Sequence, residues 1–171
     1  LIDRWKYQNK VSMAFKPTID DRYTVDGVIV THNDEHVSCF QVSSGKQILE
    51  VVASSKEDVD CVAIDELFMI PGGGEACIEL FKKGYNVAIA SIDLSFSGVP
   101  FEEVVKVMPF CTEIIKCTAV CSVCKKDARY THKKNSVKFV EDFESNVDQI
   151  EVGGEELYDA RCQRHHPYMC N

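Results

Sequence analysis

The chain has 171 residues, of which 45% are hydrophobic and 27% charged, a balance typical of a folded globular protein rather than a disordered or collagen-like one. This length suits one ordinary domain, with or without a small additional lobe, and excludes a second large domain. The net charge of −8 opposes nonspecific nucleic-acid binding, and the sequence has neither a long apolar run nor a basic leader, so we expect a cytoplasmic protein that binds neither nucleic acid nor a membrane.

Apolar runs predict three strands in the first part of the chain. The run at residues 11–15 is ended by a Lys-Pro pair. The runs at residues 61–64 and 87–92 are β-prone, and each is followed by an aspartate. Short, continuously apolar runs of this kind are typical of strands in a parallel sheet.

Helical periodicity predicts helices at residues 1–7, 47–53, 75–83 and 101–110. The first segment has the pattern of a helix interior, so we expect the natural chain to begin before Leu1. In the third, Cys77, Leu80 and Phe81 share one face, and Gly84 supplies the stop. Strands that alternate with helices favour an α/β fold built on a parallel sheet.

The composition and periodicity of the sequence change near Cys117. Beyond this point cysteines lie closer together, a basic and polar stretch follows, and helical periodicity disappears. We therefore predict two parts, an α/β core at residues 1–116 and a small separate lobe at residues 117–171.

Two pairs of residues have the spacing of metal ligands. Cys121 and Cys124 form the first pair, Cys162 and His165 form the second, and two residues separate the members of each pair. Such pairs converge on one ion and together complete a tetrahedral shell. We therefore expect a structural zinc ion that ties together a lobe too small to be held by core burial, with His166 as an alternative to His165.

The other cysteines are expected to be reduced. The chain has nine cysteines and no leader, which argues against a disulfide framework. Five of them have apolar neighbours and are predicted to fill the core: Cys39, Cys61, Cys77, Cys111 and Cys117.

Carboxylates follow the predicted strand at residues 61–64. Asp65 and Glu66 would lie at the carboxyl edge of the sheet, where α/β proteins bind ligands. An aspartate there can hold magnesium, and the adjacent glutamate can accept a proton from a hydroxyl nucleophile. A solvated strand end is an equally good interpretation of these two residues alone. Residues 20–23 form a second charged cluster, for which an ordinary polar turn is the simpler interpretation.

The glycine run at residues 72–74 lacks the Gly-Lys-Ser/Thr ending of a phosphate-binding loop, and we interpret it as a connector. No such P-loop motif occurs in the 171 residues.

A collinear set of motifs extends over nearly the whole chain. In order, these are residues 16–23 (KPTIDDRY), 31–32 (TH), 63–66 (AIDE), 93–101 (ending GVPF), 116–124 (KCTAVCSVC) and 152–154 (VGG) before Tyr158 and Cys162. The set resembles the cellular-type thymidine kinase family. This resemblance implies a P-loop-type α/β core, a zinc-binding lobe and a lasso loop over the nucleoside.

The resemblance also implies an activity. Members of the family transfer the γ-phosphoryl group of ATP, with magnesium, to the 5′-hydroxyl of thymidine in deoxynucleoside salvage for DNA synthesis. They usually form tetramers, so we expect a homo-oligomer, either a tetramer or its tandem-domain equivalent, and feedback inhibition by dTTP is a further expectation.

Carried over by position, the resemblance gives individual residues a role. Glu66 matches the general base for the 5′-hydroxyl, Asp65 the acid near magnesium, and Asp20 and Arg22 an element beside the phosphates. The zinc ligands match the four residues that the spacing selects. The residues expected at the nucleoside, which include part of the lasso at residues 149–154, are Met69, Ile92, Phe96, Phe101, Gln149, Glu151, Val152, Gly153 and Tyr158.

The chain also departs from the family pattern. Phe68 stands where the family usually has Gln, residues 94–99 lack a basic residue, and the phosphate loop expected directly before Leu1 is not in the sequence. Two alternatives therefore stand beside the kinase. One is a catalytically degenerate kinase-like subunit with a structural or regulatory role, and the other is a zinc-ribbon protein with no nucleoside site.

Overall fold

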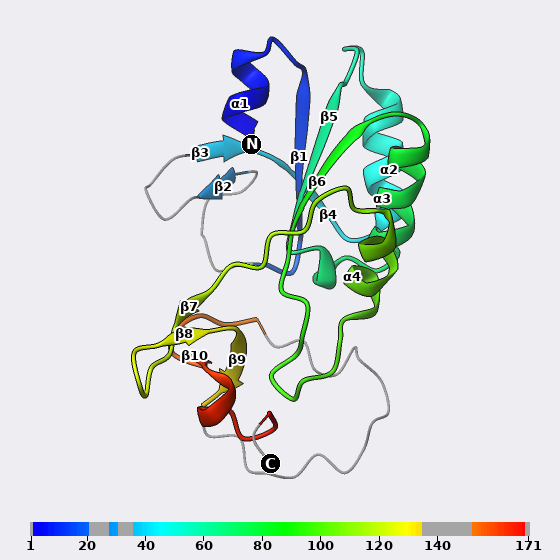
Figure 1. Ribbon diagram of the computed structural model, residues 1–171. Coiled ribbons are helices and arrows are strands. Elements are labelled where there is room, and N and C mark those ends of the chain that lie inside the picture. Colours follow the sequence, from blue (N-terminus) through cyan, green and yellow to red (C-terminus); the bar gives the residue numbers. More distant parts are fainter. Residues whose placement is uncertain (1, 21–27, 31–35, 135–151, 170–171) are drawn as a thin grey trace. The chain divides into compact units, whose positions relative to one another are not determined.

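The computed structural model describes residues 2–20, 28–30, 36–134 and 152–169 (Figure 1). The chain divides into two compact units. The first comprises Leu1–Ile92 and Glu102–Phe110, and the second comprises Asp93–Phe101 and Cys111–Asn171. Within the described ranges, no helix combines the length and the apolar character needed to cross a membrane.

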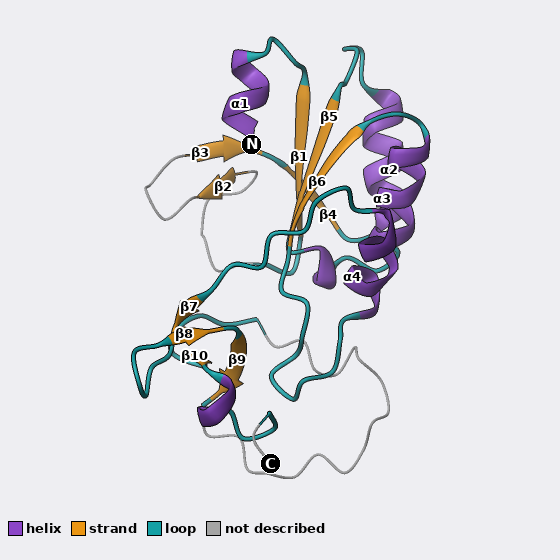
Figure 2. Cartoon of the chain, viewed as in Figure 1, coloured by secondary structure: helices purple, strands orange, loops and turns teal. Residues whose placement is uncertain are grey.

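A parallel sheet of four strands organises the first unit (Figure 2). The strands lie in the order β4 (Phe40–Val42), β1 (Ser12–Pro17), β5 (Cys61–Asp65) and β6 (Asn86–Ala90). Phe15 lies opposite Ile64, which in turn lies opposite Ile89, so these large side chains share one face of the sheet. The sheet confirms the predicted α/β fold.

Helices lie on both sides of this sheet (Figure 1). On one side, α2 (Gly45–Ser54) and α3 (Gly73–Lys82) pack together and bury Ile48 and Leu80. On the other side, α1 (Ile2–Tyr7) packs against β1 and buries Trp5. The last helix, α4 (Glu102–Val107), packs against α3.

Short elements complete the two units. In the first unit they are the antiparallel pair β2 (Val28–Val30) and β3 (His36–Ser38) and the 3₁₀ turns η1 (Leu67–Met69) and η2 (Met108–Phe110). In the second unit they are the antiparallel pairs β7 (Ala119–Val120) with β8 (Asp127–Ala128) and β9 (Tyr130–Lys133) with β10 (Tyr158–Arg161), and the 3₁₀ turn η4 (Gln163–His165).

The prediction that the glycine run at residues 72–74 is a connector is wrong. Gly73 and Gly74 form the first turn of α3, and Gly72 precedes them in the left-handed conformation, with φ of 70°. A Cβ atom on Gly74 would lie 2.7 Å from the carbonyl oxygen of Glu103. Glycine is therefore required both by the backbone conformation and by the close approach of α4.

Two other predicted boundaries shift. β6 ends at Ala90, where its pairing with β5 ends, rather than at residue 92. The α-helix expected to run to residue 110 ends at Val107 and continues as η2. Pro109 explains this change, because a proline disfavours the α conformation in the residue before it.

The cysteines are only partly where we expected them. Cys61 and Cys77 are buried and Cys39 is half-buried, whereas Cys111 and Cys117 are exposed, so the prediction of core positions is wrong for these two. Both lie in the stretch of residues 111–120, every one of which is exposed, and their apolar neighbours are therefore on the surface as well. No disulfide joins the cysteines that the structure describes.

Candidate active site and metal centre

The acidic pair lies at the carboxyl edge of the parallel sheet. Asp65 is the last residue of β5 and lies opposite Ala90 of β6. Glu66 follows in the left-handed conformation, with φ of 49° and ψ of 48°. Its N–H donates to Asp65 Oδ1 at 3.1 Å, and its carbonyl accepts the N–H of Met69 at 2.9 Å. The chain therefore leaves the sheet at Glu66 and turns at once into η1.

The turn after Glu66 is attached to the neighbouring strand end. The N–H of Phe68 donates to Ser91 Oγ at 3.2 Å, and that hydroxyl donates to the carbonyl of Ile92 at 3.0 Å. The three side chains of η1 are buried, and α4 packs against them. These contacts fix the backbone that carries the acidic pair.

A second charged pair lies near the end of β1. Lys16 is 3% exposed and Asp20 is 6% exposed, so both are buried. The register of β1 and β5 brings Lys16 to the level of Asp65 at the sheet edge. Burial raises the pKa of the nearby Cys39 thiol, the Lys16 charge lowers it and the Asp65 charge raises it, as expected when both charges lie close to the thiol. In the sequence, Lys16 stands out only as part of the Lys-Pro pair that ends a predicted strand. We therefore did not predict Lys16 as a site residue. The predicted phosphate-site residue Arg22 lies outside the described residues.

The residues predicted to contact the nucleoside are divided between the two units. In the first unit, Met69 is a buried residue of η1, and Ile92 follows β6 with a 40% exposed side chain. In the second unit, Phe96 and Phe101 lie in the segment of residues 93–101, and Phe101 is buried.

Internal hydrogen bonds close the segment of residues 93–101 on itself. The N–H of Ser95 donates to the Val99 carbonyl at 2.8 Å, and Ser95 Oγ accepts the N–H of Val99 at 3.1 Å. The N–H of Phe101 donates to the Asp93 carbonyl at 3.1 Å. The ammonium of Lys133 lies 5.5 Å from the centre of the Phe96 ring, within the range of a cation–π contact.

The remaining predicted nucleoside residues lie at or before β10. Tyr158, half-buried, begins β10, and its N–H donates to the carbonyl of Gly154 at 3.0 Å. Gly153 packs on Leu157 and, like Val152, is half-buried. Two further residues predicted for the lasso, Gln149 and Glu151, fall outside the part of the chain that the structure describes.

The four predicted metal ligands come together in the second unit. The ligand atoms of Cys121, Cys124, Cys162 and His165 all lie within 4.8 Å of one another. The Sγ atoms of Cys124 and Cys162 are 3.7 Å apart, and His165 Nδ1 lies 3.8 Å from Cys121 Sγ and 3.2 Å from Cys162 Sγ. Zinc–sulfur bonds of about 2.3 Å in a tetrahedron place two sulfurs about 3.8 Å apart, so this donor set fits zinc.

One thiol of the cluster, that of Cys121, is favoured in its metal-binding form, whereas the pKa of Cys124 is raised. A backbone hydrogen bond from Lys126 would lower that pKa, but burial and the neighbours Cys162 and Cys121 raise it. Burial would raise the pKa of Cys121, but hydrogen bonds from the backbone N–H groups of Cys124, Cys162 and Val123 lower it to about 5. A thiol with this pKa is largely the thiolate at neutral pH, and the thiolate is the form that binds a metal.

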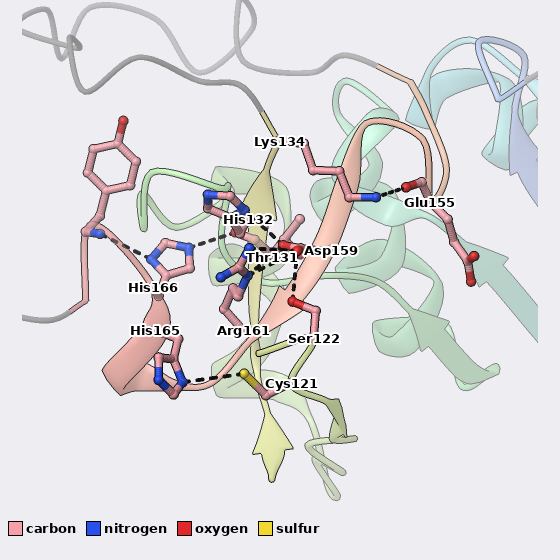
Figure 3. Close-up of polar contacts among 11 residues, drawn as sticks. Cys121, Ser122, Thr131, His132, Lys134, Glu155, Asp159, Arg161, His165 and His166 are labelled. Carbon is pink, nitrogen blue, oxygen red and sulfur yellow. Dashed lines mark hydrogen bonds and ion pairs between the residues drawn. The ribbon is translucent and has the colours of Figure 1, made fainter. Parts of the chain in front are cut away.

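His166, the alternative ligand, forms hydrogen bonds with residues outside the cluster (Figure 3). Its Nδ1 accepts the N–H of Tyr168 at 3.3 Å, and its Nε2 lies 2.8 Å from the carbonyl oxygen of Thr131. The residue is 1% exposed, and its ring is tilted against those of Tyr130 and Tyr168, with ring centres 5.7 and 6.0 Å away. Within the described residues, His165 therefore completes the cluster and His166 packs the interior of the lobe.

Comparisons with known proteins agree with this architecture. The family model described as thymidine kinase matches residues 1–166. A thymidine kinase from Pyrobaculum aerophilum is 30% identical over 166 residues, which make up 96% of this chain and 87% of that protein. The matched residues include both the acidic sheet edge and the Cys/His cluster.

Proposed function

Because this chain belongs to the thymidine kinase family, we propose that it transfers the γ-phosphoryl group of ATP to the 5′-hydroxyl of thymidine, with Glu66 as the general base. The observation that carries the proposal is the position of Glu66, directly after the strand end, in a backbone conformation that the surrounding hydrogen bonds hold. The cellular role would be deoxynucleoside salvage.

Glu66 has the chemistry that this step needs. A carboxylate within hydrogen-bond reach of the 5′-hydroxyl can take its proton as the oxygen attacks the γ-phosphorus. General-base catalysis of this kind contributes a factor of about 10²–10⁴ to the rate. The Glu66 side chain is half-buried, so fewer water molecules compete with the 5′-hydroxyl for its carboxylate.

The neighbouring charges suit the magnesium complex of ATP. Asp65 would hold the magnesium ion that accompanies ATP, and magnesium neutralises charge on the phosphate oxygens. Asp20, buried beyond the end of β1, and Arg22 would lie beside the phosphates. The residues that the family resemblance assigns to the nucleoside in this proposal are Met69, Ile92, Phe96, Phe101, Gln149, Glu151, Val152, Gly153 and Tyr158.

A phosphoryl-transfer assay on the full-length gene product, with ATP, magnesium and thymidine, tests the assignment of Glu66. We expect Glu66→Gln to lower kcat by a factor of about 10²–10⁴, because the amide cannot accept the hydroxyl proton, while thymidine affinity stays near wild type. Glu57→Gln is the matched control, since Glu57 is an exposed glutamate outside the site. Undiminished turnover in Glu66→Gln would rule out the role of this residue.

The second candidate is a kinase-like subunit without catalysis. It is favoured by Phe68, which replaces the usual Gln of the family and is 9% exposed, so it packs in the core and offers no hydrogen bond to a base. Thymidine binding without any phosphoryl transfer by the wild-type protein would select this candidate. The zinc-ribbon alternative predicts no binding at all.

The remaining expectations extend the proposal. Zinc in the Cys/His cluster would be structural, because four protein ligands leave no open coordination position. A homo-oligomer and feedback inhibition by dTTP stay predictions that follow from the family, and a cytoplasmic location stays a prediction from the sequence.

A further inference from the structure

One carboxylate joins three segments of the second unit (Figure 3). Asp159 lies in the middle of β10, directly opposite His132 of β9. Its Oδ1 lies 2.9 Å from His132 Nδ1, and its Oδ2 accepts the hydroxyl of Ser122 at 2.8 Å. The guanidinium of Arg161 donates to both oxygens, at 2.9–3.1 Å. The side chain of Asp159 is 15% exposed, and its bonds to His132 and Arg161 are partly buried, whereas Ser122 is exposed.

The bond to Ser122 reaches the metal cluster. Ser122 lies between the two cysteines of the first ligand pair, and its backbone N–H donates to the carbonyl of Ala160 at 3.0 Å. Asp159 and Ala160 thus hold the turn between Cys121 and Cys124 against β10 through one side-chain and one backbone bond. Partners that orient the ligands of a metal are worth about 10–100-fold in metal affinity.

The second link from Asp159 towards the cluster is electrostatic and involves the guanidinium of Arg161. Zinc with three thiolates and one neutral histidine carries a net charge of −1. Arg161 directly precedes the ligand Cys162, and its guanidinium donates to both oxygens of Asp159. The Asp159 carboxylate therefore holds a cation on the residue next to a ligand of the cluster.

The same strand carries the residue predicted to face thymine. Tyr158 directly precedes Asp159, and residue 159 is three positions before the ligand Cys162. Successive side chains of a strand point to opposite faces, so Asp159 and Arg161 share one face of β10 while Tyr158 and Ala160 share the other. Any shift of Asp159 moves the backbone of Tyr158.

We propose that Asp159 is a positioning residue that couples the Cys/His metal centre to the strand presenting Tyr158 to the nucleoside. The thymidine part of this inference rests on the proposed function, whereas the metal part does not. Metal retention and thymidine affinity should therefore change together when the carboxylate is altered.

The first experiment measures zinc release from the full-length, zinc-loaded protein to a chromogenic chelator, with no substrate present. We expect Asp159→Asn to release zinc at least about 10-fold faster than wild type, because the amide cannot accept bonds from Ser122, His132 and Arg161 together. Asp159→Glu keeps the charge and should restore part of the retention. Asp127→Asn is the matched control, since Asp127 is an exposed aspartate of β8 in the same lobe.

The second experiment measures thymidine kinetics with zinc at saturation. We expect Asp159→Asn to raise the KM for thymidine several-fold and to leave kcat near wild type, because the residue acts on binding geometry and not on the reacting atoms. A loss of stability large enough to unfold part of the protein would lower the active fraction and therefore kcat instead. If the wild-type protein transfers no phosphoryl group, calorimetric thymidine affinity replaces KM.

The outcomes are distinct. Zinc release from Asp159→Asn at the rate of Asp127→Asn overturns the proposal, and so does faster zinc release with unchanged thymidine KM. If Asp159→Asn does not fold, Ser122→Ala and Asp159→Glu are judged by the same two measurements. Failure of the proposed function shows instead as wild-type protein that binds no thymidine, and zinc release still decides the metal part.

Discussion

At the residue scale, the left-handed backbone of Glu66 sets the geometry of the acidic edge. A residue other than glycine in this conformation costs about 1 kcal/mol or more. The N–H of Glu66 donates to Asp65, and the turn that follows is bonded to Ser91, so the surroundings hold the conformation in place. A glutamate kept at a position where glycine would be less strained is the pattern expected of a functional residue.

This strain can be measured with two substitutions that both delete the side chain. We expect Glu66→Gly to be more stable than Glu66→Ala by about 1 kcal/mol, because only glycine adopts a φ of 49° without steric cost. Urea denaturation of the two variants measures the difference. Equal stability, or a less stable glycine variant, would show that the backbone at this position is not strained.

A second residue-scale prediction concerns acid. Burial would raise the pKa of Asp159, but hydrogen bonds from Arg161, Ser122 and His132 lower it from its ordinary 3.8 to about 2. Because the pKa is lower in the folded state, the stabilisation is fully present above about pH 4 and is lost as the pH falls towards 2.

The stability difference between wild type and Asp159→Asn follows from this linkage. At pH 7 we expect the variant to be less stable by about 1–2 kcal/mol in urea denaturation. The difference should persist down to about pH 4 and shrink below it. A difference that grows on acidification would contradict the assignment, and Asp127→Asn provides the baseline for removing a carboxylate from this lobe.

At the element scale, the start of α3 is held by a carboxylate from α4. The N–H groups of Gly72 and Gly74 donate to Glu103 Oε1 and Oε2 at 3.2 and 2.7 Å. Lys106 lies 3.3 Å from the same carboxylate and 2.7 Å from that of Glu75. Glycine at these positions lets the backbone approach the carboxylate, which satisfies the free N–H groups of the helix start. Since α4 also packs on η1, this contact supports the turn after Glu66.

Two neighbouring glutamates allow a matched test of this contact. We expect Glu103→Gln to lower the free energy of unfolding by about 1 kcal/mol, because an amide is a weaker acceptor than a carboxylate and cannot present two acceptor oxygens. Glu102→Gln should have little effect, since Glu102 is 69% exposed and pairs only with Lys106 among the contacts described here. Urea denaturation compares them, and equal losses would contradict the role of Glu103.

At the scale of the whole molecule, the two units are stabilised by different means. The first buries a continuous apolar core around Phe15, Ile48, Ile64 and Leu80. The second has strands of only two to four residues, and it contributes few of the buried apolar side chains described. Strand pairs this short are not stable alone, so the Cys/His cluster is expected to supply the missing stability.

Removal of the metal should therefore affect one unit selectively. We expect a chelator at neutral pH to abolish hydrogen-exchange protection in β9 and β10 while β1 and β5 keep theirs. Cys121→Ser should reproduce the effect, and Cys111→Ser should not, because Cys111 is an exposed cysteine outside the cluster. Simultaneous loss of protection in both units, or in neither, would contradict this division of stability.

The sequence by itself determined the features that depend on neighbours along the chain. Apolar runs located β1, β5 and β6, periodicity located α2 and α3, and Gly84 marked the end of α3 with a positive φ. The spacing within each Cys/His pair predicted the residues of the cluster that could hold a metal ion, because two ligands on one tight turn converge whatever the rest of the fold does.

Only the tertiary structure decided the features that depend on contacts between distant residues. Glu103 reaches Gly74 across 29 positions and His132 meets Asp159 across 27, and no local pattern encodes either contact. The same holds for the choice of His165 over His166, for the burial of Lys16 and for the exposure of Cys111 and Cys117. Local propensity is set by the chain's own backbone and spacing, whereas burial and pairing exist only once strands and helices are packed in register.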